Sequence, residues 1–529
     1  MAGKGRGWAP GYPQFRLTPR QARTDSNSLC SGGLILLGFA VRKHQKQDRE
    51  ASAMSADMNF TMTINGKAVA GTEKFGVENP ALGEVFAEAP NCTQAELDEA
   101  VAAARAALPA WRKAPIEKRK EVMLAIAGVI AQNGEELARL LTREQGKPFE
   151  QAMGDVLGGA HWFAETAKMD IPEIVSQDDD ERYTVTRYEP IGVVAAIVPW
   201  NFPIILAAFK LAPALLAGNT VVLKPAPTTP LTTLRLAELI RDVVPAGVLN
   251  VVSGDDRLGP WLTGHSGIDK ISFTGSTQTG RKVMEGASKE LKKVTLELGG
   301  NDAAIVMPDV NVEAIAQELF WAAFQNTGQI CIATKRMYVH KDIYEPLKTA
   351  LVEYAKTVKV GDGSQQGTQI GPIQNKAQYQ RVLDLIQDSK DKGYKFLIGG
   401  EASEAPGYFV PVTILDNPPE DARIVQEEQF GPVLPLMSFE NLDEVVSRAN
   451  DTIYGLGASV WSADIAKAQE IADQLETGTV WINETQHLSP HASFGGAKQS
   501  GIGSEGAEHG LLEFCQAKTT NIRRNAAFV

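Results

Sequence analysis

The chain contains 529 residues, of which 43% are hydrophobic and 22% are charged, and its formal net charge at pH 7 is −12. These fractions are typical of a globular protein, and no run approaches ~18 apolar residues, so disordered, collagen-like and membrane-spanning classes are excluded. An acidic chain also lacks the basic surface that nucleic-acid binding requires.

The cysteines and the N-terminal charge bear on the compartment. Four cysteines, at 30, 92, 331 and 515, are too few for a disulfide framework and indicate a reducing environment. Residues 1–56 carry nine Lys/Arg and three Asp/Glu, so this head has a net charge of +6 and the rest of the chain −18. We expect 1–57 to be a disordered basic extension, or sequence upstream of the working start, in a cytoplasmic protein. A mitochondrial presequence, and hence the mitochondrial matrix, is the alternative.

From Met58 onward the pattern becomes regular. An alternating strand at 60–67 ends in an Asn-Gly turn, and a capping box at 93–96 opens an Ala-rich helix that runs to about Ala107. Strict alternation over 182–189 predicts an exposed antiparallel ribbon. Further helical sequence covers 116–144 and 149–168.

Short apolar strands follow, separated by helical stretches of 10–15 residues. This alternation predicts an α/β fold with a parallel, doubly wound sheet, and a second βα series covers about 303–473. The strands are expected at 193–198, 220–223, 248–252 and 271–273.

The segment Gly275-Ser-Thr-Gln-Thr-Gly280 lies between a predicted strand and a predicted helix. Its spacing matches neither the dinucleotide fingerprint nor a P-loop, and such a turn is as often plain turn chemistry as an anion site. A phosphate is still favoured there, because a helix N-terminus presents free amides and a positive dipole end.

Three polar residues stand in unusual apolar surroundings. Cys331 follows a Gly-Gln turn between two isoleucines, Glu297 lies in an apolar strand that ends in a double glycine, and Asn201 follows another buried strand. A lone carboxylate in such a run is costly to bury unless it has a function. Open α/β sheets bind their ligands at the ends of such strands.

These segments resemble the NAD(P)-dependent aldehyde dehydrogenase superfamily over essentially residues 58–524. The matching motifs are Pro199-Trp-Asn-Phe-Pro203, Lys224-Pro225, the 275–280 turn, Leu296-Glu-Leu-Gly-Gly300, Asn326-x-Gly-Gln-x-Cys331, Glu427-Glu-x-Phe-Gly-Pro432, Trp481-Ile-Asn483 and Phe494-Gly-Gly-x-Lys-x-Ser-Gly-x-Gly503.

The resemblance implies an oxidoreductase that converts an aldehyde to a carboxylic acid. Cys331 would attack the aldehyde carbonyl, and the Asn201 amide with the Cys331 N–H would hold the resulting oxyanion. Glu297 would act as general base toward the water that releases the acid and toward the Cys331 thiol. A thiol hydrolase using the same cysteine and a non-catalytic structural relative are the two alternatives.

The resemblance also implies the cofactor site, for which NAD is expected and NADP is the alternative. Proline stands at 227, where NAD-preferring members often carry a carboxylate that would repel a 2′-phosphate. The residues assigned to the cofactor are Trp200, Lys224, Gly275, Ser276, Thr277, Gly280, Glu428 and Phe430.

The implied architecture has two Rossmann-like, doubly wound parallel-sheet domains and a small antiparallel oligomerisation ribbon. The NAD(P)-binding domain is expected at 58–181 and 190–298, and the catalytic domain at 299–480. Residues 182–189 and 481–529 would supply the substrate loop and the bridge of a homodimer or homotetramer.

The substrate side is expected to be mixed polar and aromatic, which suits a small to medium aldehyde. Phe202, Phe209, Leu488 and Phe494 supply the apolar part, whereas Gln325 replaces a frequent aromatic residue. No metal site is expected, because the loop histidines near 487–491 lack carboxylate or cysteine partners.

Overall fold

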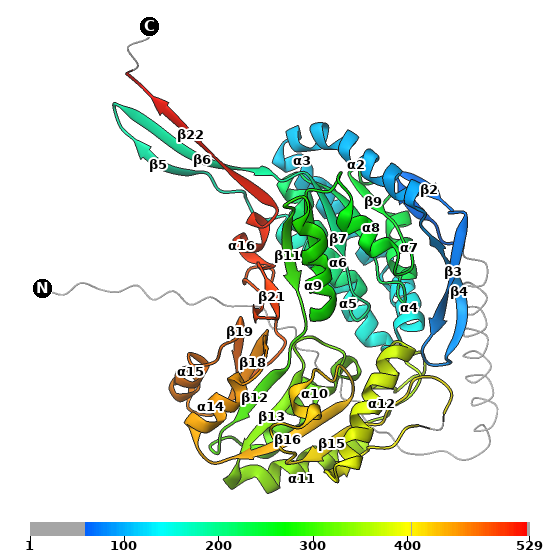
Figure 1. Ribbon diagram of the computed structural model, residues 1–529, viewed down its shortest axis with the longest axis vertical. Coiled ribbons are helices and arrows are strands. Elements are labelled where there is room, and N and C mark those ends of the chain that lie inside the picture. Colours follow the sequence, from blue (N-terminus) through cyan, green and yellow to red (C-terminus); the bar gives the residue numbers. More distant parts are fainter. Residues whose placement is uncertain (1–58, 404, 526–529) are drawn as a thin grey trace, which may run out of the picture. The chain divides into compact units, whose positions relative to one another are not determined.

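The computed structural model describes residues 59–403 and 405–525. The basic segment 1–57, expected to be an extension, lies outside these residues. Element labels below follow Figure 1.

The first sheet has eight strands in the order β2-β1-β9-β8-β7-β10-β11-β21 (Figure 1). Its five central strands are parallel, and β2, β1 and β21 pair antiparallel at its edges. The chain fills one side of β7 before it returns to the other side at β10, so the topological switch point lies between these two strands. The strands are β1 (Met62–Ile64), β2 (Lys67–Val69), β7 (Val193–Ile197), β8 (Thr220–Lys224), β9 (Leu249–Val251), β10 (Lys270–Thr274), β11 (Lys293–Glu297) and β21 (Gly501–Ile502).

Helices between these strands cover the first sheet. The predicted capping box at Thr93 and Glu96 is confirmed, but the helix continues past Ala107 and through Pro109 because Trp111, one turn further, is buried in the core. The helical stretch predicted over 116–144 divides at Asn133. The helices are α2 (Gln94–Lys113), α3 (Ile116–Gln132), α4 (Gly134–Gln145), α5 (Phe149–Thr166), α6 (Pro203–Ala217), α7 (Leu231–Leu239), α8 (Leu258–Gly264) and α9 (Thr277–Ser288).

The second sheet has seven strands in the order β14-β15-β16-β13-β12-β18-β19, and all but β14 run parallel. Its strands are β12 (Asp302–Val306), β13 (Thr334–His340), β14 (Lys395–Ile398), β15 (Thr413–Asp416), β16 (Val433–Phe439), β18 (Gly457–Trp461) and β19 (Thr479–Ile482). The connecting helices are α10 (Val312–Phe324), η1 (Gln325–Gly328), α11 (Lys341–Thr357), α12 (Lys376–Asp391), α13 (Arg423–Gln426), α14 (Leu442–Asn450) and α15 (Ile465–Ala472).

An antiparallel ribbon of three strands extends away from the helices of the first sheet (Figure 1). Strand β6 (Arg182–Pro190) pairs on one side with β5 (Ile174–Asp178) and on the other with β22 (Cys515–Arg523). Sequence analysis did not identify β5, whose five residues are all exposed. Two parallel sheets and an antiparallel ribbon confirm the predicted fold class.

Smaller elements complete the described chain. Strands β3 (Glu73–Asn79) and β4 (Glu84–Asn91) form a hairpin, β17 (Tyr454–Gly455) pairs with β20 (Ala497–Lys498), and helix α16 (Ala507–Leu512) precedes β22. Within residues 59–403 and 405–525, no helix is both long and apolar enough to cross a bilayer.

Candidate active site

A cavity of about 280 Å³ lies at the switch point of the first sheet, where the segments after β7 and β10 face the loop before β13. Ligands of open α/β sheets bind at this place. Its lining residues are Pro199, Trp200, Asn201, Thr274, Gly275, Ser276, Thr277, Gln278, Leu298, Gly299, Cys331, Gln378, Arg381, Glu428, Phe430 and Tyr454.

The loop that carries Cys331 has an unusual backbone. Three consecutive residues, Asn326, Thr327 and Gly328, adopt left-handed conformations with φ of 50°, 61° and 70°. A β-branched residue rarely adopts such a φ, and the strain persists only where neighbours fix the backbone. Here the Thr327 hydroxyl donates to the Gly371 carbonyl at 3.0 Å, and the Asn326 N–H donates to Gln151 Oε1 at 3.1 Å.

Cys331 follows this strained turn and lines the cavity. Burial raises the pKa of its thiol to about 12, while the nearby Lys335 ammonium acts in the opposite direction. Asp302, Glu428 and Glu297 add to the rise in pKa. A thiol in these surroundings needs a base before it can react, because the thiolate is the nucleophile.

Glu297, the last residue of β11, is buried, and neither of its carboxylate oxygens has a hydrogen-bond partner within the described chain. Burial, with the charge of Glu505 next, raises its pKa well above the ordinary value. Buried polar groups are normally paired, so this exception makes the carboxyl group a candidate for a functional role.

Asn201 is buried where the chain passes from β7 to α6, and its amide donates to the Gln329 carbonyl at 3.0 Å. Its backbone carbonyl accepts from the Lys147 ammonium at 2.7 Å, and Lys147 also pairs with Asp155 at 3.2 Å. Asp155 in turn accepts from the Ile205 N–H at 2.8 Å, so one buried ion pair fixes both ends of this turn.

Lys210 on α6 is fully buried and pairs with Glu505 at 2.7 Å. Both charges of this pair act on Glu297, so the pair lies close to the predicted base. Glu505 was missed, since the partner that reveals it is 295 positions away in the chain.

Helix α9 begins at the cavity, immediately after Gly275. Ser276 is its N-cap and accepts from the Thr279 N–H at 3.2 Å, and Thr277 is its first residue. Gly280 allows the helix to approach β11 closely, because a Cβ at this position would lie 2.5 Å from a methyl group of Leu298. Free amides at a helix start suit the pyrophosphate of a dinucleotide.

Glu428 and Phe430 line the other side of the cavity. Oε1 of Glu428 accepts from the Gly300 N–H at 3.0 Å, and Gly299 leaves space for Oε2, from which a Cβ would be only 2.4 Å away. Phe430 is left-handed, with φ of 49°, and its ring meets Trp200 edge to face at 5.3 Å. The Glu428 carboxylate can accept hydrogen bonds from hydroxyl groups of a ligand, and the two aromatic rings can pack against it. This side of the cavity therefore fits a nucleotide cofactor.

Two residues assigned to the cofactor do not line the cavity. Gly280 acts through helix packing, as described above. Lys224 ends β8, pairs in register with Ile197 at the end of β7, and is buried. Burial lowers the pKa of the Lys224 ammonium to about 8.

Sequence analysis missed several lining residues, among them Gln378, Arg381 and Tyr454. It also missed Lys335, whose contacts are described below. Gln378 and Arg381 lie on α12 and Tyr454 lies on β17, so only the fold brings them to the cavity, whereas Lys335 lies on β13, four positions after Cys331. No cluster of His, Cys, Asp or Glu that could hold a metal was found in the part of the chain that the structure describes.

An apolar cluster surrounds Cys331. Phe202, Leu488 and Phe494, expected on the substrate side, pack in one cluster with Cys331. Phe209 lies elsewhere, because its ring stacks on Trp162 at 3.6 Å inside the core of the first sheet.

Comparison with known proteins agrees with this geometry. Residues 68–520 match the aldehyde dehydrogenase family. A Pseudomonas protein named "Probable aldehyde dehydrogenase" is 42% identical over 472 residues, which are 89% of this chain and 96% of that protein. The chain therefore belongs to the aldehyde dehydrogenase family, as its motifs implied.

Solved structures give the same result. The NAD+ complex of an aldehyde dehydrogenase from Bacillus cereus superposes with a TM-score of 0.87 at 36% identity, covering 89% of this chain and 99% of that one. Betaine aldehyde dehydrogenase from Staphylococcus aureus, also in complex with NAD+, has a TM-score of 0.87 at 33% identity and covers 91% and 98%.

Proposed function

We propose that this chain oxidises an aldehyde to a carboxylic acid with NAD through a covalent thioester on Cys331. The observation that carries the proposal is that Cys331, Asn201, the start of α9 and Glu428 line one cavity, with Glu297 buried nearby and no hydrogen-bond partner for its carboxylate among the described residues.

NAD would be held at both ends of this cavity. The start of α9, with Ser276 and Thr277, would receive the pyrophosphate, and Glu428 would accept hydrogen bonds from ribose hydroxyls. Phe430 and Trp200 would pack near the nicotinamide end. The chemistry that NAD supplies when bound is acceptance of the hydride that leaves the tetrahedral adduct.

The chain's own groups then account for formation of the adduct. Glu297 takes the proton of the Cys331 thiol, and the thiolate attacks the aldehyde carbonyl carbon. The Asn201 amide and the Cys331 N–H donate to the oxyanion that forms, in a site where water is scarce. Lys147 keeps Asn201 in place through the Asn201 carbonyl.

Glu297 also serves the second half of the reaction. Its raised pKa makes it a stronger base than an exposed carboxylate once it is ionised. After it has released the thiol proton to solvent, it would remove a proton from the water that attacks the thioester carbonyl and return that proton to the departing Cys331 thiolate, so that the acid is released and the thiol is restored.

A panel of aldehydes with NAD, monitored through the absorbance of the reduced nicotinamide, tests this proposal. Wild type should produce reduced cofactor, and Cys331→Ala should not. Equal rates in both proteins would exclude the mechanism. Ester hydrolysis without cofactor reduction would favour the thiol hydrolase, and inactivity of wild type in all assays would favour the non-catalytic relative.

We propose NAD rather than NADP as the preferred cofactor, with some tolerance of NADP. Position 227 is proline, so no carboxylate repels a 2′-phosphate there, and no arginine at this position attracts it. Steady-state kinetics with both cofactors decides the point, since a strong preference for NADP would contradict it.

We propose a small to medium aldehyde as substrate. Phe202, Leu488 and Phe494 offer an apolar wall beside Cys331, and the loop around 484–491 adds polar groups. Within an aldehyde series, kcat/KM should therefore reach its maximum at medium chain length, and a steady rise toward long alkyl chains would contradict this assignment.

We propose a homodimer or homotetramer assembled through the ribbon of β5, β6 and β22, because exposed strands at a sheet edge tend to be covered.

Three described cysteines, Cys92, Cys331 and Cys515, are free, which supports a reducing compartment such as the cytoplasm, with the mitochondrial matrix as the alternative.

A further inference from the structure

Lys335 occupies an unusual place in the second sheet. In the register between β12 and β13, Asp302 pairs with Thr334 and the next residue, Ala303, pairs with Arg336. Lys335 is therefore the extra residue of a β-bulge and has no partner on β12. Bulges redirect side chains and are common next to active sites.

The ammonium group of Lys335 is directed at the nucleophile loop. It donates to the backbone carbonyls of Ile330 and Cys331, both at 2.7 Å, and to that of Ala333 at 3.3 Å. Its side chain is 3% exposed, so these carbonyls exclude water from the charge. Such charge-assisted hydrogen bonds are strong and directional.

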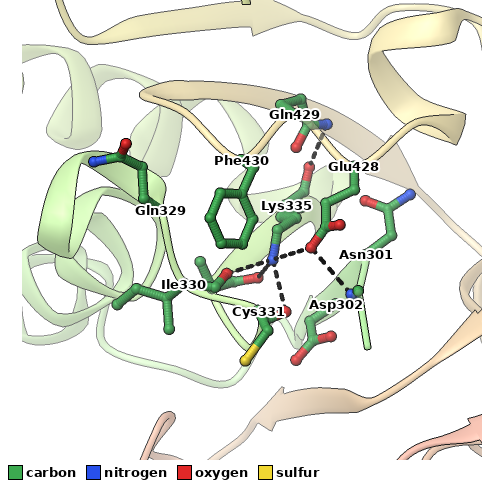
Figure 2. A network of polar contacts seen from close by, with 12 residues as sticks. Asn301, Asp302, Gln329, Ile330, Cys331, Lys335, Glu428, Gln429 and Phe430 are labelled. Carbon is green, nitrogen blue, oxygen red and sulfur yellow. Dashed lines mark hydrogen bonds and ion pairs between the residues drawn. The ribbon is translucent and has the colours of Figure 1, made fainter. Parts of the chain in front are cut away.

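The same group also reaches the cofactor side of the cavity. Figure 2 shows the Lys335 ammonium between the carbonyls of the nucleophile loop and the carboxylate of Glu428. The two charges are 3.7 Å apart, and the ammonium lies 5.9 Å from the centre of the Phe430 ring. The side-chain amide of Gln429, which lies between Glu428 and Phe430 in the sequence, donates to the Lys335 carbonyl at 3.3 Å.

Charged groups of both signs act on the Cys331 thiol. Glu297, Asp302 and Glu428 are acids that oppose a thiolate, whereas Lys335 is the only cation among them. Removal of the Lys335 charge would thus leave the thiolate facing carboxyl groups alone.

We propose that Lys335 is a positioning residue which fixes the Cys331 loop, supplies the positive charge that favours the thiolate, and holds Glu428 for the cofactor. This inference rests on the proposed function, because it takes Cys331 as the nucleophile.

Alkylation of Cys331 by iodoacetamide in the cofactor-free protein tests this inference. The rate, measured from pH 6 to 10 by mass analysis of the Cys331 peptide, follows the thiolate fraction. Each unit of rise in thiol pKa lowers that fraction about tenfold but raises the thiolate's nucleophilicity about threefold. Lys335→Gln should therefore slow alkylation about threefold or more at pH 8 and increase the Kd for NAD.

Lys292→Gln is the matched control. Lys292 is also buried and also donates to two backbone carbonyls, those of His265 and Ile268, but it has no contact with the cavity residues. Its variant should alkylate at the wild-type rate. A wild-type rate and pH profile in Lys335→Gln would overturn the proposal, as would equal slowing in both variants.

Two further variants keep the test decisive. If Lys335→Gln does not fold, Lys335→Ser admits water to the carbonyls and should give the same slowing. Glu428→Gln removes an opposing charge and should accelerate alkylation, so slowing there would overturn the charge argument. Failure of the proposed function is distinguishable, because it is measured separately as aldehyde turnover by Cys331→Ala.

Discussion

At the scale of single residues, burial controls the reactivity of Cys331 and Glu297. Burial raises the pKa of both groups. The proposed mechanism needs each of them in deprotonated form. We therefore predict that kcat/KM increases with pH. At acidic pH, the increase should be up to about tenfold per pH unit. A pH–rate profile from 6 to 10 checks this, and a flat profile would contradict the assigned roles.

The buried pair of Lys147 and Asp155 leads to a prediction about stability. Both side chains are fully buried, so loss of one partner leaves an uncompensated charge. Lys147→Met should lower the free energy of unfolding by about 3–5 kcal/mol. Lys118→Met, which removes an exposed pair with Glu121, should change it by less than about 1 kcal/mol. Urea unfolding measures both variants, and equal effects would refute the prediction.

The sequence was most informative for residues whose type conflicts with their surroundings. Cys331, Glu297 and Asn201 stand out as polar groups beside apolar runs, and the structure places each of them at or near the cavity. Lys335 and Glu505 gave no such signal. Their significance depends on partners that the bulge and the long-range pairing bring close, and local patterns do not encode those contacts.

At the scale of elements, the position of α9 depends on Gly280. A methyl group there would meet Leu298, which lines the cavity, so either this leucine or the start of α9 has to shift at the edge of the cofactor site. Such overpacking costs ~1–3 kcal/mol, and about 1.4 kcal/mol corresponds to a tenfold change in affinity. Gly280→Ala should thus weaken NAD binding about tenfold in a calorimetric titration.

Gly154→Ala is the control for this change. Gly154 also lies inside a helix, but a Cβ there would meet nothing within 4 Å. It should leave NAD affinity unchanged and raise the free energy of unfolding by roughly 0.5–1 kcal/mol. Equal affinity in both alanine variants would show that the approach of α9 does not shape the cofactor site.

Elements differed in how well local pattern predicts them. Buried parallel strands such as β7 and β8 are near-continuous apolar runs bounded by turns, so they were located closely. The end of α2 was misplaced because the tertiary burial of Trp111 overrides the local effect of Pro109. Strand β5 was missed because its exposed residues form a strand only through pairing with β6.

At the scale of the whole molecule, the ribbon supports a prediction about assembly. Strand β22 pairs with β6 along nine residues, and eight of its nine residues are exposed. Deletion of residues 515–529 should therefore convert the proposed oligomer to monomers in multi-angle light scattering. Unchanged mass after the deletion would show that assembly uses another surface.

Both sheets contribute residues to the two-step reaction that we propose. The first sheet supplies Asn201, Glu297 and the start of α9, while the second supplies the Cys331 loop and Glu428. In the proposed mechanism the nucleophile, Cys331, thus comes from the second sheet and the base, Glu297, from the first.

Glu297→Gln, incubated with an aldehyde and NAD, tests the central claim most directly. The variant lacks the base for hydrolysis, so the thioester should accumulate, and mass spectrometry should find the acyl group on the Cys331 peptide. Full turnover without such an adduct, or an acyl group on another residue, would contradict the account.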